Sequence, residues 1–163
     1  NKGNAMKAVE ARLLELENEI RALKDKDSIR TLLSKYAVAV DEKNRSSLGE
    51  LFTEDSAIQI PVWEVDVNGK VAVLEFYDTY WSRFNNPRRY FANESFTMGK
   101  DDAQVFMYWH VTQDSGNDSY LGWGTYHWRF RRLEKFWKIA AVKIDILAMT
   151  TLAAGWARKS KFV

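Results

Sequence analysis

The stretch KYAVAVDEKNRSSLGELFTEDSAIQI, residues 35–60, holds the end of one helix, a short second helix and the start of a strand. Its first apolar residues belong to a stripe spaced i, i+3, i+4, i+7, i+8 and i+11, which predicts one face of a buried amphipathic helix. The members of this stripe are Ile29, Leu32, Leu33, Tyr36, Ala37 and Val40. Asp41 follows where the stripe ends. We expect this helix to begin at Asp27 or Ser28, because either side chain can cap a helix.

A second apolar pattern precedes this helix and is out of phase with it. Its members are spaced by three and four residues in turn, as in a heptad repeat: Met6, Val9, Leu13, Leu16, Ile20 and Leu23. The pattern covers about two and a half heptads, so this segment either packs on its own domain or contacts another chain. We therefore divide the chain into an N-terminal helix, residues 1–26, and a domain, residues 27–163.

The remainder of the chain changes from a helical to a strand pattern. Residues 71–84 carry an aromatic stripe with helical spacing, and Pro87 follows soon after. Beyond it lie four long strand candidates joined by short turns, residues 88–98, 103–113, 119–132 and 136–149. Helices followed by a meander of strands predict an α+β fold, with a curved sheet that has helices on one face. Gly122 and Gly124 within a strand predict a bend or a close backbone approach.

The composition excludes several classes of protein. The 163 residues are 46% apolar and 14% aromatic, which is enough for one well-packed domain. A net charge of +2 gives no reason to expect nucleic acid or an anionic membrane as a partner. Cysteine is absent, which excludes disulfides and favours a cytoplasmic location. Two histidines without ligand-type spacing predict no metal site, and no cofactor motif is present.

The order of these segments resembles that of a known family. The residues that carry the resemblance are KYAVAVDEKN, LGELFTEDSAIQI, RRYFANESF and the closing WRFRRLEKFWKIAAVKID, spread over about residues 27–150. They are similar to the NTF2-like superfamily and, within it, to the SnoaL-like group, which includes dehydratases and a dehydrochlorinase. The resemblance implies a cone in which a strongly curved antiparallel sheet wraps around helices and leaves a deep apolar pocket.

The resemblance also implies positions for the working residues. In the dehydratase-like members a tyrosine and an aspartate five residues apart line the pocket, and Tyr36 and Asp41 match that spacing. Those members carry a catalytic histidine at the start of the strand that corresponds to RRYFANESF. This chain has Arg89 or Tyr90 there instead.

The two histidines lie on predicted strands and have different neighbours. His110 shares a strand face with Phe106 and Tyr108, and a face that carries polar groups on aromatic bodies is typical of a pocket wall. The opposite face of that strand is large and apolar, which predicts core. His127 shares its face with polar and aromatic residues, although a single histidine on a strand is more often structural or exposed.

We therefore predict a cofactor-independent lyase that eliminates water from a small hydroxylated aromatic or polycyclic compound by general acid–base chemistry. Asp41 is the expected base and His110 its acid–base partner. Tyr36, with Arg89 or Tyr90, is expected to orient a carbonyl oxygen. The remaining expected substrate contacts are Tyr108, His127, Trp63 and Trp81. Five aromatic residues are expected to be core residues or, alternatively, walls for a flat ligand: Trp63, Trp81, Tyr77, Tyr80 and Trp109.

Two other functions fit the same sequence. An isomerase or cyclase would use the same pocket groups, and a non-catalytic subunit, such as the small subunit of a ring-hydroxylating dioxygenase, would use the same fold. The heptad pattern and an apolar C-terminal tail predict a homo-oligomer. The resemblance favours a trimer, with a dimer next.

Overall fold

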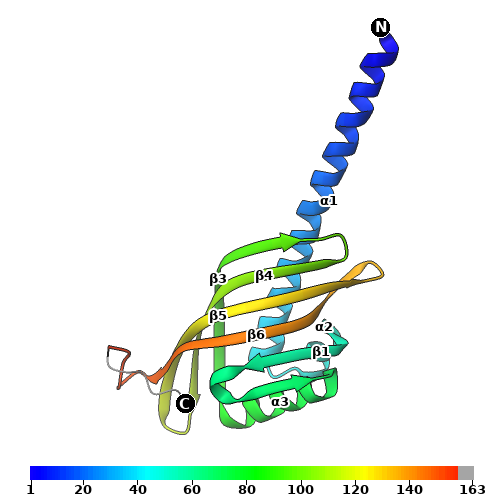
Figure 1. Cartoon of the computed structure of the whole chain (residues 1–163). Helices are drawn as coiled ribbons and strands as arrows, with labels where there is room; N and C mark the ends of the chain where they lie inside the picture. The colour runs from blue at the N-terminus through cyan, green and yellow to red at the C-terminus, as the bar shows by residue number, and fades with distance from the viewer. Residues whose placement is uncertain (158–163) are drawn as a thin grey trace.

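The computed structural model describes residues 1–157 and contains three α-helices and six strands within them (Figure 1). Helix α1 is long, and the two other helices flank the first two strands. In chain order the elements are α1 (Lys2–Asp41), α2 (Arg45–Leu51), β1 (Phe52–Ile60), a 3₁₀ turn (Pro61–Trp63), β2 (Val65–Asn68), α3 (Lys70–Arg83), β3 (Asn85–Met98), β4 (Asp102–Ser115), β5 (Asp118–Leu133) and β6 (Phe136–Thr151). The expected α+β order is confirmed.

The six strands form one curved sheet in the order β2-β1-β6-β5-β4-β3. Strands β3 to β6 make the expected antiparallel meander. The expectation of a wholly antiparallel sheet is corrected at one pair, because β1 runs parallel to β6, with Ile58 opposite Val142. Strand β6, the last one within residues 1–157, therefore lies inside the sheet, between β1 and β5.

The curvature of the sheet coincides with irregular pairing. The register of β5 against β6 shifts between Trp123 and Gly124, and a bulge of this kind bends a strand. A Cβ atom at Gly124 would lie 1.9 Å from the carbonyl oxygen of Asp145 and 2.8 Å from the Trp109 ring. The prediction of a close backbone approach at this glycine is confirmed.

Helix α1 runs without interruption through the point where a new helix was expected. The prediction that Asp27 or Ser28 caps a second helix is wrong: the Ser28 hydroxyl instead donates a hydrogen bond to the Lys24 carbonyl of the same helix, at 2.8 Å. No glycine or proline lies between residues 21 and 41 to break the helix. A change of apolar phase therefore rotates the buried face and does not end the helix.

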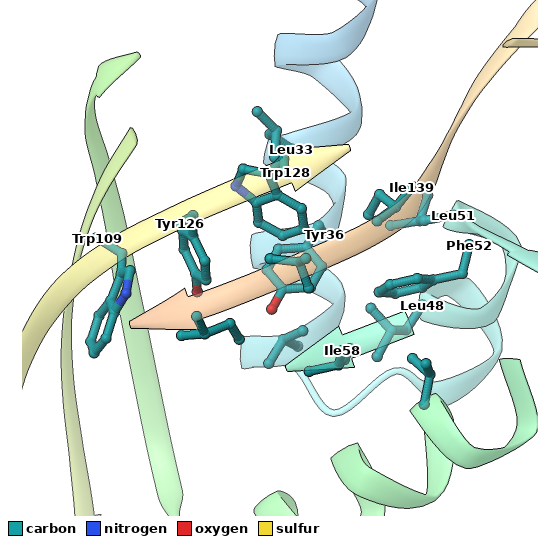
Figure 2. Packing of buried hydrophobic residues seen from close by; sticks show 14 of the residues in the cluster. Leu33, Tyr36, Leu48, Leu51, Phe52, Ile58, Trp109, Tyr126, Trp128 and Ile139 are labelled. Carbon is teal, nitrogen blue, oxygen red and sulfur yellow. The ribbon is translucent and has the colours of Figure 1, made fainter. Parts of the chain in front are cut away.

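The two halves of α1 have different surroundings. Residues 2–24 are exposed along the whole projecting part of the helix, whereas Ile29, Leu33, Tyr36 and Val40 are buried (Figure 1). The buried half packs against the concave side of the sheet, where Tyr36 meets Trp128 with ring centroids 4.9 Å apart (Figure 2).

One ion pair marks the boundary between the two halves. Asp25 accepts hydrogen bonds from Arg132, at 2.6 Å, and from the Trp137 indole, at 3.2 Å. The Arg132 guanidinium also stacks over the Trp137 ring, 4.4 Å from its centroid. Burial alone would raise the pKa of Asp25, but these two donors outweigh it and lower the pKa.

None of the helices among residues 1–157 has the length and apolar character needed to cross a membrane.

Candidate functional site

A small cavity of about 50 Å³ lies between the buried half of α1, helix α3 and the concave face of the sheet. Most of its wall is apolar, and its polar groups come from tyrosines, one arginine and one glutamine. The lining residues are Tyr36, Ile60, Trp63, Phe76, Tyr77, Tyr80, Arg89, Trp109, Val111, Gln113, Tyr126, Ile144, Ile146 and Met149. An engineered protein cavity of roughly 150 Å³ binds benzene. This cavity is much smaller, so an aromatic ligand requires lining side chains to move.

Four tyrosines supply hydroxyl groups to this wall. Tyr36 and Tyr77 share a hydrogen bond of 2.7 Å between their hydroxyl oxygens, and Tyr80 donates to the side-chain oxygen of Gln113. The Tyr36 and Tyr126 hydroxyls point to the same side of the core (Figure 2). Burial raises the pKa of all four phenols. They are therefore neutral at ordinary pH and can donate hydrogen bonds, but they are poor bases.

Arg89 connects this cavity to the end of α1. Its Nε donates to one oxygen of Asp41 at 2.6 Å, and its backbone N–H donates to the other at 3.1 Å. Its Nη2 donates to the Tyr80 hydroxyl at 3.0 Å. The side chains of Arg89 and Asp41 are each only 8% exposed. Helix α1, strand β3 and helix α3 are thus held together by one buried chain of hydrogen bonds.

The guanidinium of Arg89 remains charged in this environment. Burial alone would lower the pKa of Arg89, but the oxygens of Tyr80, Tyr126 and Tyr36 and the Asp41 carboxylate together raise it above its ordinary value. Among residues 1–157, Arg89 is the only formally charged side chain that lines the cavity. It can therefore stabilise negative charge on an oxygen of a bound molecule.

Asp41 lies behind Arg89 and is not part of the cavity wall. Both of its oxygens accept hydrogen bonds from Arg89, which fixes the position of the guanidinium. Asp41 was expected to line the pocket, but it contacts Arg89, which lines the cavity in its place. Tyr36, five residues earlier, contacts the cavity directly.

The predicted partnership of Asp41 and His110 is wrong. His110 is exposed on the outer face of β4, whereas its neighbours Trp109 and Val111 point inward and line the cavity. Side chains alternate along a strand, so a residue cannot share the inner face with both of its neighbours. Phe106, Tyr108 and His110 do share one face, as expected, but it is the outer one.

Three of the expected substrate contacts also lie outside the cavity. Tyr90 pairs with His110 across β3 and β4 and is 65% exposed, and Tyr108 is 47% exposed on the same outer face. His127 is exposed as well, with its Nε2 3.5 Å from a carboxylate oxygen of Asp145. The cavity and the core share the concave face, whereas these three side chains lie on the outer face, away from both.

The two expected tryptophan contacts have different positions. Trp63 lines the cavity and packs nearly parallel to Phe84, with ring centroids 6.3 Å apart. Trp81 does not line it and donates a hydrogen bond from its indole to the Val40 carbonyl, at 2.8 Å. Trp81 thus holds the end of α1 against α3, which is a structural position.

Sequence reasoning gave Tyr126 and Gln113 no role, although both line the cavity. Tyr77, Tyr80 and Trp109 were expected to be core residues or ligand walls; all three are buried and line the cavity. The sequence signal that could have identified Tyr126 and Gln113 is a side chain with a hydroxyl or amide group at a position whose strand face is otherwise apolar and points inward. Within residues 1–157, no three histidine, aspartate or glutamate side chains are grouped so as to hold a metal ion.

A family model described as a SnoaL-like domain matches residues 21–143. The chain belongs to the SnoaL-like family. No curated protein sequence matches it. Within the family match lie the buried half of α1, all of α3 and most of the sheet, and therefore most of the cavity wall.

Solved structures similar to this SnoaL-like chain support the fold. Hexachlorocyclohexane dehydrochlorinase LinA-type3 from Novosphingobium barchaimii is 17% identical, with a TM-score of 0.76, over 89% of this chain and 99% of that one. A candidate scytalone dehydratase from Novosphingobium aromaticivorans is 16% identical, with a TM-score of 0.73, over 79% and 88%. A Nostoc punctiforme protein of unknown function with a cystatin-like fold is 19% identical, with a TM-score of 0.66, over 75% and 90%.

Proposed function

We propose that this chain is a cofactor-independent lyase that removes water from a small hydroxylated aromatic compound bound in the cavity. The observation that carries the proposal is the convergence of one charged guanidinium and several neutral phenols on a mostly apolar wall. Donors held in a dry site stabilise an oxyanion much better than water does. A ketone or phenol oxygen next to Arg89 would gain this stabilisation as negative charge develops on it.

The protein groups assist the carbonyl end of the elimination. Arg89 would hold a carbonyl oxygen, which makes the neighbouring C–H group acidic. Tyr80, which accepts from Arg89 and donates to Gln113, would position the guanidinium. When that C–H bond breaks, its electron pair forms the new double bond and the C–O bond to the hydroxyl group breaks. Neither a carboxylate nor an imidazole lines the cavity among residues 1–157. The departing hydroxyl oxygen would therefore take the proton itself and leave as water.

Asp41 acts here as a positioning residue. Because both of its oxygens are bonded to Arg89, it fixes the donor that would touch the substrate. This role replaces the base expected from the sequence. Its loss would then disturb catalysis through Arg89, and would weaken substrate binding and turnover together.

Two similar proteins support the choice of an elimination. Their names, a dehydrochlorinase and a candidate dehydratase, both denote the removal of a small molecule from a substrate. The cavity volume favours compounds with one ring over the polycyclic compounds considered from the sequence, because even one ring requires the wall to move.

To test the proposal, the protein is incubated with a panel of single-ring β-hydroxy ketones. The conjugated product is detected by its absorbance and by mass spectrometry. We expect at least one compound to lose one water. Arg89→Lys should lower kcat/KM by about 10²-fold, the scale for removing one oxyanion donor. Tyr80→Phe removes a hydroxyl that positions the guanidinium and should lower kcat/KM by a smaller factor. His110→Gln, on the outer face, is the matched control and should leave turnover unchanged. Unchanged turnover in Arg89→Lys would contradict the proposal.

A binding protein without catalytic activity is the second candidate, and the lack of a carboxylate or imidazole in the described wall favours it. Such a protein would quench its tryptophan fluorescence on addition of a panel compound and return that compound unchanged. An isomerase would give a product of unchanged mass. Both outcomes would exclude the lyase while retaining the pocket.

A further inference from the structure

The projecting half of α1 carries a continuous apolar seam on which no other element of residues 1–157 packs. The side chains of this seam, Met6, Val9, Leu13, Leu16, Ile20 and Leu23, are 37–65% exposed. Single exposed apolar residues are ordinary, but a row at heptad spacing is the interface of a coiled coil. This seam is separate from the cavity and does not depend on the proposed function.

The seam points away from the domain that follows it. Ile20, in the seam, and Ile29, in the buried stripe, are nine residues apart, which is about two and a half helical turns. Their side chains therefore lie on opposite sides of the same uninterrupted helix. A second helix on the seam would be separated from the first domain by the width of α1, so two domains can lie on the outer sides of a helix pair without collision.

The charges beside the seam select a partner and an orientation. In the heptad, Met6, Leu13 and Ile20 occupy position a, which places Arg12 and Glu19 at g and Glu17 and Lys24 at e. In a parallel pair of identical helices, each g residue faces the e residue five positions later on the other chain. Arg12 would face Glu17, and Glu19 would face Lys24. Both contacts pair opposite charges, and symmetry repeats each of them.

We propose that residues 6–23 form a parallel two-stranded coiled coil with a second copy of this chain. The seam ends at Asp27, an exposed charge at the next a position, so the contact stops where the domain begins. The dimer buries the apolar row that one chain leaves in water. It also places the two cavities on opposite outer sides of the assembly.

The first experiment measures the mass of the full chain by sedimentation equilibrium at micromolar concentration. We expect a mass twice that of the 19.0 kDa chain. Leu13→Glu with Leu16→Glu should give a monomer. Leu14→Glu is the control, because Leu14 is 59% exposed on the same turn but lies off the seam. A monomeric parent, a trimer, or a dimer that survives the double change would overturn the proposal; the last result would place the interface elsewhere, such as on the outer face of the sheet.

A charge swap tests the predicted pairs. Arg12→Glu should weaken dimerisation by about tenfold, since it turns two attractions into repulsions. Adding Glu17→Arg should restore it. Arg12 also contacts Glu15 within its own helix, at 2.9 Å, and that contact stays lost in the double variant. Residues five apart on one helix do not face each other, so restoration has to come from the second chain. Failure of the restoration would contradict the parallel pairing.

A single cysteine tests the orientation directly. The chain has no cysteine, so Met6→Cys gives one reactive position per copy. In the parallel dimer the two copies of residue 6 lie side by side and should oxidise to a covalent dimer. In an antiparallel pair residue 6 faces residue 23, and efficient crosslinking would occur only between Met6→Cys and Leu23→Cys chains. That result would overturn the orientation.

Discussion

The two halves of α1 are equally helical and each carries an apolar stripe, yet one is buried and the other projects. Residues 29–41 direct their apolar stripe into the sheet, whereas residues 6–23 direct theirs away from it. The difference lies in phase, since the helix is continuous and the stripe turns by about half a turn between Ile20 and Ile29. An apolar pattern therefore establishes that a helix has a partner, and its phase relative to the next pattern indicates on which side that partner lies.

The largest loss of stability should come from Asp41, at the end of the buried half of α1. Asp41→Ala leaves the buried Arg89 charge without its carboxylate, so we expect a loss of about 3–5 kcal/mol in the free energy of unfolding, measured in urea. Glu42→Ala is the control, because Glu42 pairs with Arg88 in a contact that is more than half exposed. It should cost less than about 1 kcal/mol. Equal losses would remove the distinction between the two carboxylates.

A matched pair of leucines compares the halves without charge. Leu33 is 2% exposed and Leu14 is 59% exposed on the same helix. Leu33→Ala should lower the free energy of unfolding by about 3 kcal/mol, through lost burial and a residual cavity. Leu14→Ala should change it by less than about 0.5 kcal/mol. Thermal melts of both variants provide the measurement, and similar melting temperatures would mean that the projecting half is covered at Leu14 as well.

Tyr36 tests whether the buried half also supports the cavity. Tyr36→Phe keeps the ring and removes the hydroxyl that is bonded to Tyr77. We expect a cost of about 1–2 kcal/mol, because the Tyr77 hydroxyl loses a buried partner. Tyr108→Phe, on the exposed outer face, should be neutral in the same urea titration. A neutral Tyr36→Phe would indicate that water replaces the lost hydroxyl.

The smallest effect is expected at the boundary of the two halves. Asp25→Asn should cost about 1 kcal/mol at pH 7, by weakening the contact with Arg132. The pKa of Asp25 is lowered in the folded chain, so its contribution is complete above the unfolded pKa of about 3.9 and is lost as the pH falls through the lower folded value. The stability difference between parent and variant should thus shrink below about pH 4. A constant difference from pH 7 to pH 2 would contradict this.

Much of the fold could be predicted because it depends on local patterns. The stripe of α1, the aromatic stripe of α3 and the alternation in β4 each identify an element and its buried side. The continuity of α1 was missed because Asp27 and Ser28 are good N-cap residues. A capping residue alone does not end a helix, and no glycine or proline lies between residues 21 and 41 to interrupt it. The parallel pairing of β1 with β6 depends on contacts between distant segments, which local patterns do not encode.

The site was predictable only in part, for a geometric reason. Alternation separated His110 from Trp109 correctly, but it does not say which face is concave. The polar tips of Tyr108 and His110 suggested a pocket, whereas the cavity uses hydroxyls from inward residues such as Tyr77 and Tyr126. The bond between Asp41 and Arg89 joins residues 48 positions apart, and it required the structure.

The interior position of β6 has a consequence for how the chain folds. Residues 136–151 supply the strand that joins β1 to the rest of the sheet, and they follow the other five strands of residues 1–157 in chain order. Until they emerge, β1 and β5 both have an unpaired edge, and such edges promote aggregation. Closure of this long loop is slow compared with helix formation, because distant pairing requires the chain ends to meet first. The helices would thus form early, while the cavity between them and the sheet would be completed only when the final strand inserts.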